Sequence, residues 1–174
     1  MTEHIVLVGL PASGKTRLGK LIASHLSRDF IDLDAAIEAA TGKTISQLFE
    51  RGEEYFRQRE TEALREAIGS QNPAVISTGG GIVEREVNRH MLARTHVVFI
   101  DVPVEIAIRR AQRSQARPLF AQNLPATMRK LAGRRRDLYL GVASQTVQLD
   151  DSEAKDNAQL IIDTINQYNP GELP

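Results

Sequence analysis

The feature that most constrains how this chain can fold is a stretch of eight residues near its start. It fits the pattern G-x-x-x-x-G-K-[ST] and reads Gly9-Leu10-Pro11-Ala12-Ser13-Gly14-Lys15-Thr16. The apolar run 5–8 before it predicts a buried strand, and the apolar residues at 18, 21, 22 and 26 after it repeat at helical spacing. A strand, a glycine-containing loop and a helix in this order are the context in which the pattern binds phosphate.

The chemistry of the loop follows from its residue types. The backbone N–H groups around Gly9, Ala12, Ser13 and Gly14 are expected to converge on an anion, and the helix N-terminus adds a partial positive charge. Lys15 is expected to reach the β- and γ-phosphates of a nucleotide. Thr16 is expected to place its hydroxyl on Mg²⁺. The alternative is a tight strand-to-helix turn without a ligand.

Length and composition limit the possible classes of protein. With 174 residues, the chain is expected to form one domain spanning 1–174. The 22 basic and 22 acidic residues cancel, so charge gives no indication of a nucleic-acid or membrane partner. The absence of cysteine excludes disulfides, a thiolate zinc site and a cysteine nucleophile, and the four histidines show no ligand spacing. No apolar run approaches the roughly 18 residues of a membrane helix, so we expect a cytoplasmic protein.

Strand-like and helix-like segments alternate along the chain. Strands are predicted at 5–8, 30–34, 74–77, 96–101 and 146–149, with helices between them, including 35–40, 45–51, 53–69, 84–93, 103–112 and 152–167. This order favours an α/β fold with a mostly parallel sheet covered on both faces, in which ligands bind beyond the carboxyl ends of the strands. Asp32 and Asp34 end the second strand, and alternation along a strand predicts that both point the same way.

Two helices carry a charge on a face that should be apolar. In the helix over 53–69, the inward stripe includes Glu60, and Arg57 lies one turn earlier, where it can pair with it. In the helix after Asn123, the inward stripe passes through Arg135, whereas Arg134 and Arg136 are expected to face solvent. Inward charges are costly unless they are paired, so they serve either packing specificity or a ligand.

Three consecutive glycines, Gly79, Gly80 and Gly81, follow the third predicted strand. They predict either a backbone that comes very close to another group, with N–H donors available, or a flexible turn. Because they follow a strand end, as Gly9 and Asp32 do, all these features are expected to meet at one edge of the sheet.

The segment from Ile106 to Arg136 contains no acidic residue. Its nine basic residues are Arg109, Arg110, Arg113, Arg117, Arg129, Lys130, Arg134, Arg135 and Arg136. Its middle, about 112–124, lacks periodicity and is predicted to be a mobile lid that closes over a nucleotide. A solvated basic surface is one alternative. A nucleic-acid site is another, which the lack of interleaved aromatic residues disfavours.

With these residues in view, the chain resembles the shikimate kinase family, a small branch of the P-loop proteins related to nucleoside monophosphate kinases. The resemblance runs from Ile5 to about Leu149. It rests on Asp32-Leu33-Asp34, the helix motif from Gly52 to Glu60, Ser77 to Gly81, Arg117-Pro118-Leu119, and Arg135 to Tyr139. Two positions depart from the family: Pro11-Ala12 replaces a common glycine and stiffens the loop, and Asp137 replaces a frequent proline.

The resemblance implies a fold and an activity. The fold would be a three-layer sandwich with a five-stranded parallel sheet of order 2-3-1-4-5, a substrate-binding helical segment at about 33–61 and a lid at about 112–124. The reaction would be transfer of the ATP γ-phosphate to the 3-hydroxyl of shikimate by a monomer. A kinase for another small acceptor, such as gluconate or a nucleoside monophosphate, and a non-catalytic sensor of shikimate or ATP are the alternatives.

The resemblance also implies roles for individual residues. Asp34 would contact the acceptor hydroxyl and act as the base, and Asp32 would bind Mg²⁺ through water. The acceptor carboxylate would be held by Arg57 and Arg135, with Glu60 fixing Arg57 and Gly79–Gly81 supplying backbone contacts. On the nucleotide side, Arg117 would contact phosphates from the lid, and Arg110 would lie near adenine.

Overall fold

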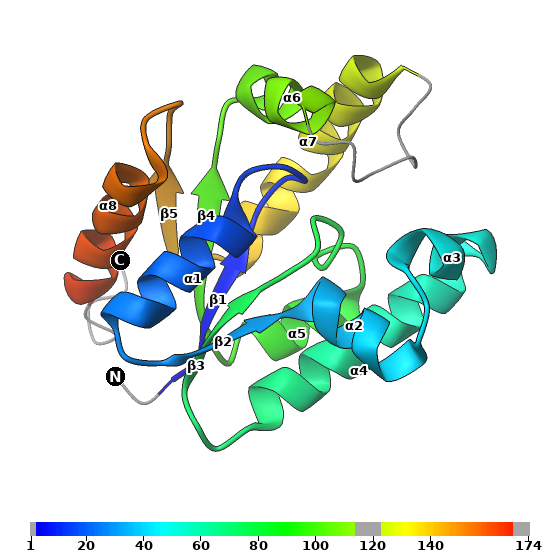
Figure 1. Cartoon of the computed structure of the whole chain (residues 1–174), viewed down its shortest axis with the longest axis horizontal. Coiled ribbons are helices and arrows are strands. Elements are labelled where there is room, and N and C mark those ends of the chain that lie inside the picture. Colours follow the sequence, from blue (N-terminus) through cyan, green and yellow to red (C-terminus); the bar gives the residue numbers. More distant parts are fainter. Residues whose placement is uncertain (1–2, 114–122, 169–174) are drawn as a thin grey trace.

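The computed structural model describes residues 3–113 and 123–168 and contains a five-stranded, all-parallel sheet. The strands are β1 (Ile5–Val8), β2 (Asp29–Asp32), β3 (Ala74–Ser77), β4 (His96–Asp101) and β5 (Gln145–Gln148). Their spatial order is β2-β3-β1-β4-β5, which confirms the expected topology. The order makes β1 the central strand and places the ends of β1, β2 and β3 side by side (Figure 1).

Eight described helices complete the domain. They are α1 (Lys15–His25), α2 (Leu33–Thr41), α3 (Ile45–Glu50), α4 (Glu53–Gly69), α5 (Glu86–Leu92), α6 (Val104–Arg113), α7 (Leu124–Val142) and α8 (Ala154–Asn166). The helices α2 and α3 pack with α4 at one side of the domain, and α6 packs on α7 (Figure 1). Among the described residues, none of these helices has the length and apolar character needed to span a bilayer.

The alternation of β1 creates two apolar cores, one on each face of the sheet. Ile5 and Leu7 belong to a cluster with α1 and α8, whereas Val6 and Val8 belong to a second cluster with α4, α5 and α7. All four side chains are fully buried, as expected for a central parallel strand that is apolar on both faces. This arrangement confirms the three-layer sandwich.

One prediction about the second strand was wrong. The strand ends at Asp32, and Asp34 lies in the first turn of α2 rather than in an extended segment. The cause is a helix cap: the Asp32 side chain accepts a hydrogen bond from the Ala35 N–H at 3.1 Å, which turns the chain into the helix at Leu33. The two carboxylates are therefore related by a capping turn and not by strand alternation.

The start of α7 is described, whereas most of the predicted lid is not. Asn123 occupies the position before α7 in a left-handed conformation, and Pro125 lies in the first turn, but the Asn123 side chain makes no capping hydrogen bond within the part of the chain described. Arg117 and most of the predicted lid lie outside the described residues.

The position of α8 leads to a prediction about stability. Ile161 is fully buried against the α1 side of the sheet, whereas its neighbour Leu160 is 47% exposed. We expect Ile161→Ala to lower the free energy of unfolding by ~2–5 kcal/mol because it leaves a cavity. Leu160→Ala is the matched control and should change it by no more than ~0.5 kcal/mol. Denaturant unfolding of both variants measures the difference, and equal losses would contradict this packing.

Candidate active site

The loop between β1 and α1 has the geometry of a phosphate-binding loop. Lys15 is buried, and its Nζ donates to the carbonyl oxygens of Gly9 at 2.9 Å and Leu10 at 2.7 Å. Its ammonium group is thereby held inside the curve of the loop. A Cβ atom on Gly9 would lie 2.6 Å from the Ile100 carbonyl oxygen, so only glycine lets the loop leave β1 here. These contacts favour the predicted anion site over a simple turn.

The loop also shows the consequence of its unusual Ala12. This residue has a φ of 60°, in the left-handed region where a side chain is unfavourable by roughly 1 kcal/mol. Gly14, at the start of α1, has a φ of 97° and is free of that penalty. The chain therefore forms the loop with alanine at a position that favours glycine, and its neighbour Pro11 further restricts the backbone.

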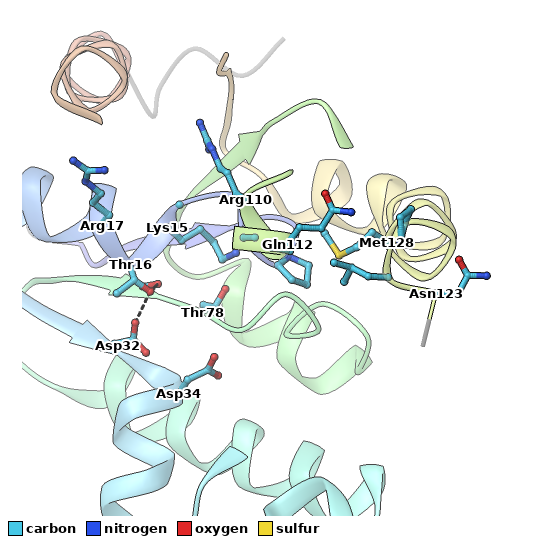
Figure 2. Close-up of a pocket in the computed structure, with 17 residues that line it drawn as sticks. Lys15, Thr16, Arg17, Asp32, Asp34, Thr78, Arg110, Gln112, Asn123 and Met128 are labelled. Atoms are coloured by element: carbon cyan, nitrogen blue, oxygen red, sulfur yellow. Dashed lines mark hydrogen bonds between the residues drawn. The ribbon is translucent and has the colours of Figure 1, made fainter. Parts of the chain in front are cut away.

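A cavity of about 1020 Å³ opens next to this loop (Figure 2). Its walls come from the loop and α1, the ends of β2 and β3, and the facing parts of α6 and α7. Thr16 and Asp32 meet at its edge: the Thr16 Oγ1 donates to the Asp32 Oδ2 at 2.6 Å and lies 3.3 Å from the Ser77 Oγ. Three oxygen-bearing side chains from three different elements therefore converge beside the loop.

This donor set is suited to Mg²⁺ and not to a metal held by protein ligands alone. No group of three or more His, Cys, Asp or Glu side chains able to hold a metal occurs within residues 3–113 and 123–168. Mg²⁺ commonly takes one or two protein oxygens and completes its octahedron with water and phosphate oxygens. Thr16 and Asp32 provide such oxygens next to the phosphate loop, so the residues fit a nucleotide-bound Mg²⁺.

A second cavity of about 440 Å³ lies between the glycine run and the helices α2, α3 and α4. Ile45, Phe49 and Phe56 contribute its apolar side, and the two phenylalanine rings stack at a centroid distance of 4.3 Å. Its polar side includes Asp34, Arg57 and Arg135. Asp34 and Pro11 line both cavities, so the Asp34 carboxylate stands at their junction.

The inward charges of α4 form a buried ion pair. The Arg57 Nη1 donates to the Glu60 Oε2 at 2.8 Å, and Nη2 also reaches the Glu53 carboxylate at 3.4 Å. Burial lowers the pKa of Arg57, but the charges of Glu60 and Glu53 outweigh it, so the net shift is upward. Burial raises the pKa of Glu60, and Arg57 opposes this shift. Pairing is thus what allows both groups to point inward.

The three glycines are required by close contacts and not by backbone freedom. A Cβ on Gly79 would lie 2.9 Å from the Glu60 Oε1, and one on Gly80 would lie 2.9 Å from the Pro11 backbone nitrogen. A Cβ on Gly81 would collide with the Arg57 guanidinium group. All three glycines are buried, so the flexible-turn alternative is wrong and the close-approach alternative is confirmed.

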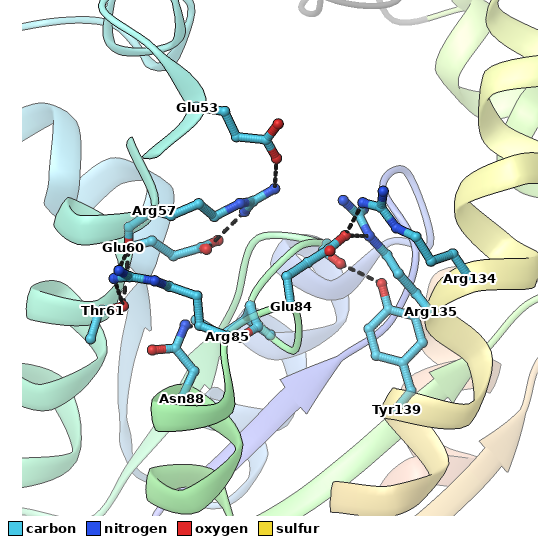
Figure 3. A network of polar contacts seen from close by, with 12 residues as sticks. Glu53, Arg57, Glu60, Thr61, Glu84, Arg85, Asn88, Arg134, Arg135 and Tyr139 are labelled. Carbon is cyan, nitrogen blue, oxygen red and sulfur yellow. Dashed lines mark hydrogen bonds and ion pairs between the residues drawn. The ribbon is translucent and has the colours of Figure 1, made fainter. Parts of the chain in front are cut away.

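Arg135 reaches the second cavity from α7. It is 5% exposed, and its Nε donates to the Glu84 carboxylate at 2.5 Å. Arg134 pairs with the same oxygen of Glu84 while staying half exposed (Figure 3). One helical turn after Arg135, the Tyr139 hydroxyl donates to the Gly80 carbonyl oxygen and ties α7 to the glycine run.

Glu84 is a residue of the site that sequence reasoning missed. Its partners lie 50 and 51 positions further along the chain. Periodicity and spacing report neighbours within one element, so no local signal identifies such a pair. The expectation that Arg134 and Arg136 face solvent holds for their exposure, but Arg134 pairs with Glu84 and Arg136 pairs with Asp101 at 2.6 Å.

The described part of the basic segment is largely neutralised by acids from elsewhere. Arg109 and Arg110 both pair with Asp151, and Arg129 pairs with Glu105. Arg110 also donates to the Ser13 carbonyl oxygen at 3.3 Å and lines the cavity at the phosphate loop. Arg117 has no described position.

Taken together, the fold and these two cavities define a P-loop phosphotransferase for a small acceptor. Comparison with known proteins specifies the family. The family model described as shikimate kinase matches residues 11–166. A shikimate kinase of Marinomonas sp. is 38% identical over 98% of this chain and 96% of its own length, and one of Thermobifida fusca is 39% identical over 90% and 91%.

Solved structures give the same result. The shikimate kinase from Acinetobacter baumannii in complex with shikimate has a TM-score of 0.90 and 38% identity, covering 97% of both chains. The enzyme from Bacteroides thetaiotaomicron has a TM-score of 0.86 and 32% identity, covering 94% of this chain and 98% of its own. The chain belongs to the shikimate kinase family and is an ATP-dependent kinase that phosphorylates a hydroxyl group.

The contact between Gly81 and Arg57 leads to a test of the site geometry. We expect Gly81→Ala to lower the free energy of unfolding by ~2 kcal/mol or more, because the new methyl group must displace a buried, paired guanidinium. Gly133→Ala in α7 is the control, since an added Cβ there would meet no described residue beyond its own helix within 4 Å, and it should be neutral or stabilising. Equal denaturation midpoints for the two variants would contradict the arrangement described.

Proposed function

We propose that this protein transfers the γ-phosphate of ATP to the 3-hydroxyl of shikimate, giving ADP and 3-phosphoshikimate. The observation that carries the proposal is that Asp34 lines both cavities. On one side lies a phosphate loop, and on the other lies a pocket with two buried arginines and an apolar wall. Such a pocket suits a small cyclic acid, and the junction is the place where donor and acceptor would meet in line.

The nucleotide side would be formed by Gly9, Ala12, Ser13, Gly14, Lys15 and Thr16. Their N–H groups and the ammonium group of Lys15 would stabilise the charge on the β- and γ-phosphates. Thr16 and Asp32 would hold Mg²⁺, with Asp32 acting through water. When bound, the ion neutralises phosphate charge and fixes the phosphate orientation. Arg110 would lie near adenine, and Arg117, outside the described residues, would contact phosphates.

The acceptor side would be formed by Asp34, Arg57, Arg135 and Gly79–Gly81. Arg57 and Arg135 would make charge-assisted hydrogen bonds to the carboxylate, since both guanidinium groups are buried beside the cavity. Asp34 would orient the acceptor hydroxyl and take its proton as the phosphate bond forms. Phosphoryl transfer depends mainly on placement and charge neutralisation, which these residues would supply.

We further expect the protein to act as a cytoplasmic monomer whose partners are ATP and shikimate. The sequence has no net charge, and most basic residues of the described basic segment have acidic partners, so neither a nucleic-acid nor a membrane partner is needed to account for them.

The experiment that tests the function is release of ADP with Mg²⁺ and ATP, with shikimate, gluconate and a nucleoside monophosphate in parallel. Turnover is expected with shikimate alone, because only a carboxylate-bearing ring matches the two arginines and the apolar wall. Turnover with another acceptor alone would keep a P-loop kinase and reject the acceptor site. Binding of ATP without turnover in any reaction would favour the sensor.

Asp34→Asn tests the proposed base. The amide keeps the size of the side chain but cannot take a proton, so we expect kcat to fall by a factor of ~100 or more while shikimate affinity changes little. Steady-state kinetics and equilibrium binding of shikimate measure the two effects separately. Unchanged turnover would remove Asp34 from the role of base.

Arg135→Ala tests the carboxylate contact. We expect the KM for shikimate to rise by a factor of ~10–100, because a charge-assisted hydrogen bond in a buried pocket is lost. Arg136→Ala is the matched control, since Arg136 is adjacent, half exposed and paired with Asp101 away from the acceptor cavity. A similar KM for both variants would exclude Arg135 from the acceptor site.

A further inference from the structure

Two neighbouring residues after the glycine run, Glu84 and Arg85, reach in opposite directions. The Glu84 side chain points toward α7, and the Arg85 side chain points toward α4 (Figure 3). These helices carry Arg135 and Arg57, the two arginines assigned above to the acceptor carboxylate. The dipeptide therefore connects both sides of the acceptor cavity.

Glu84 acts on Arg135 through one side of its guanidinium group. The hydrogen bond from Nε fixes the plane of the guanidinium group, and with it the direction in which the two Nη atoms face. Arg134 pairs with the same Glu84 oxygen, so the carboxylate also separates two adjacent cations. Partial burial raises the pKa of Glu84, but the hydrogen bonds from Arg134 and Arg135 leave it lowered overall, so Glu84 is charged at neutral pH.

Arg85 acts on α4 at the turn that carries Arg57. Its Nη2 pairs with the Glu54 carboxylate at 2.6 Å, and its Nη1 donates to the Thr61 Oγ1 at 3.1 Å. The same Nη1 lies 3.5 Å from the carbonyl oxygen of Arg57 itself. Arg85 thus holds the backbone that carries Arg57, on the side of α4 that faces α5 and the loop before it.

We propose that Glu84 and Arg85 are positioning residues that fix the separation and orientation of Arg135 and Arg57, and so set the affinity for an anionic acceptor. The identity of the acceptor rests on the proposed function. A charge effect and a positioning effect of Glu84 predict opposite changes in the affinity for an anionic acceptor. If Glu84 acted only by its charge, removing it would favour an anionic acceptor, because a nearby negative charge repels a carboxylate. If it positions Arg135, removing it must weaken binding.

The experiment compares Glu84→Gln with Glu105→Gln. Glu105 is a matched control because it also pairs with an arginine of α7, Arg129, but both side chains are half exposed and away from the acceptor cavity. We expect Glu84→Gln to raise the KM for shikimate about tenfold, as loss of one charged hydrogen bond implies, with kcat changed less than about twofold. Glu105→Gln should change neither value, and Arg85→Gln should raise the KM in the same way.

Two outcomes would overturn the proposal: a KM for Glu84→Gln that equals that of Glu105→Gln, or one that falls below the wild-type value. The methyl ester of shikimate sharpens the test, because it lacks the charged carboxylate. The difference between wild type and Glu84→Gln should largely disappear with the ester. A loss of the same size with acid and ester would mean general damage and would also overturn the proposal.

A second measurement needs no substrate. The Nε–H resonance of Arg135, assigned with Arg135→Lys, should exchange with water faster in Glu84→Gln than in the wild type and in Glu105→Gln. Unchanged exchange would overturn the positioning role. If the wild-type protein failed to phosphorylate shikimate, the proposed function would be wrong, and this measurement alone would decide whether Glu84 orients Arg135.

Discussion

The buried ion pair between Arg57 and Glu60 constrains the whole acceptor side of the molecule. Both side chains point into the fold, and Glu60 is fully buried, so neither is tolerable there without the other. Their positions leave no room for a side chain at Gly79 or Gly81. The glycines at positions 79 and 81 are therefore consequences of accommodating one pair of charges, and both charged residues line the second cavity.

The order of the strands determines how that pair relates to the phosphate loop. Because β3 lies between β2 and β1, the segments that follow these three strands meet at one edge of the sheet. Pro11 of the phosphate loop touches Gly80, and Asp34 stands between the two cavities. A parallel sheet thus brings together groups that belong to three separate parts of the chain. The Asp34 carboxylate lies where the two cavities meet.

Charge is arranged differently in the fold than along the sequence. The basic segment from Ile106 to Arg136 contains no acidic residue and suggests a strong local positive potential. However, several of its arginines pair with acids from outside the segment, namely Arg109, Arg110, Arg129 and Arg136. Exposed pairs of this kind contribute little to stability individually. Their effect is to reduce the positive electrostatic potential at the surface of the basic segment. The buried contacts of Arg57 and Arg135 are of another kind, because desolvation makes their geometry decisive.

Local patterns in the sequence predicted the elements, the phosphate loop and the inward charges on two helices, because apolar periodicity and loop pattern are local properties. A charge on an apolar stripe identified Glu60 and Arg135 in this way. The topology came from the resemblance to a family and not from these patterns. The position of Asp34 in a helical turn became visible only in the folded structure, since a cap competes with strand extension at Asp32. It alone revealed Glu84, because a contact across 51 positions arises when helices and sheet pack together.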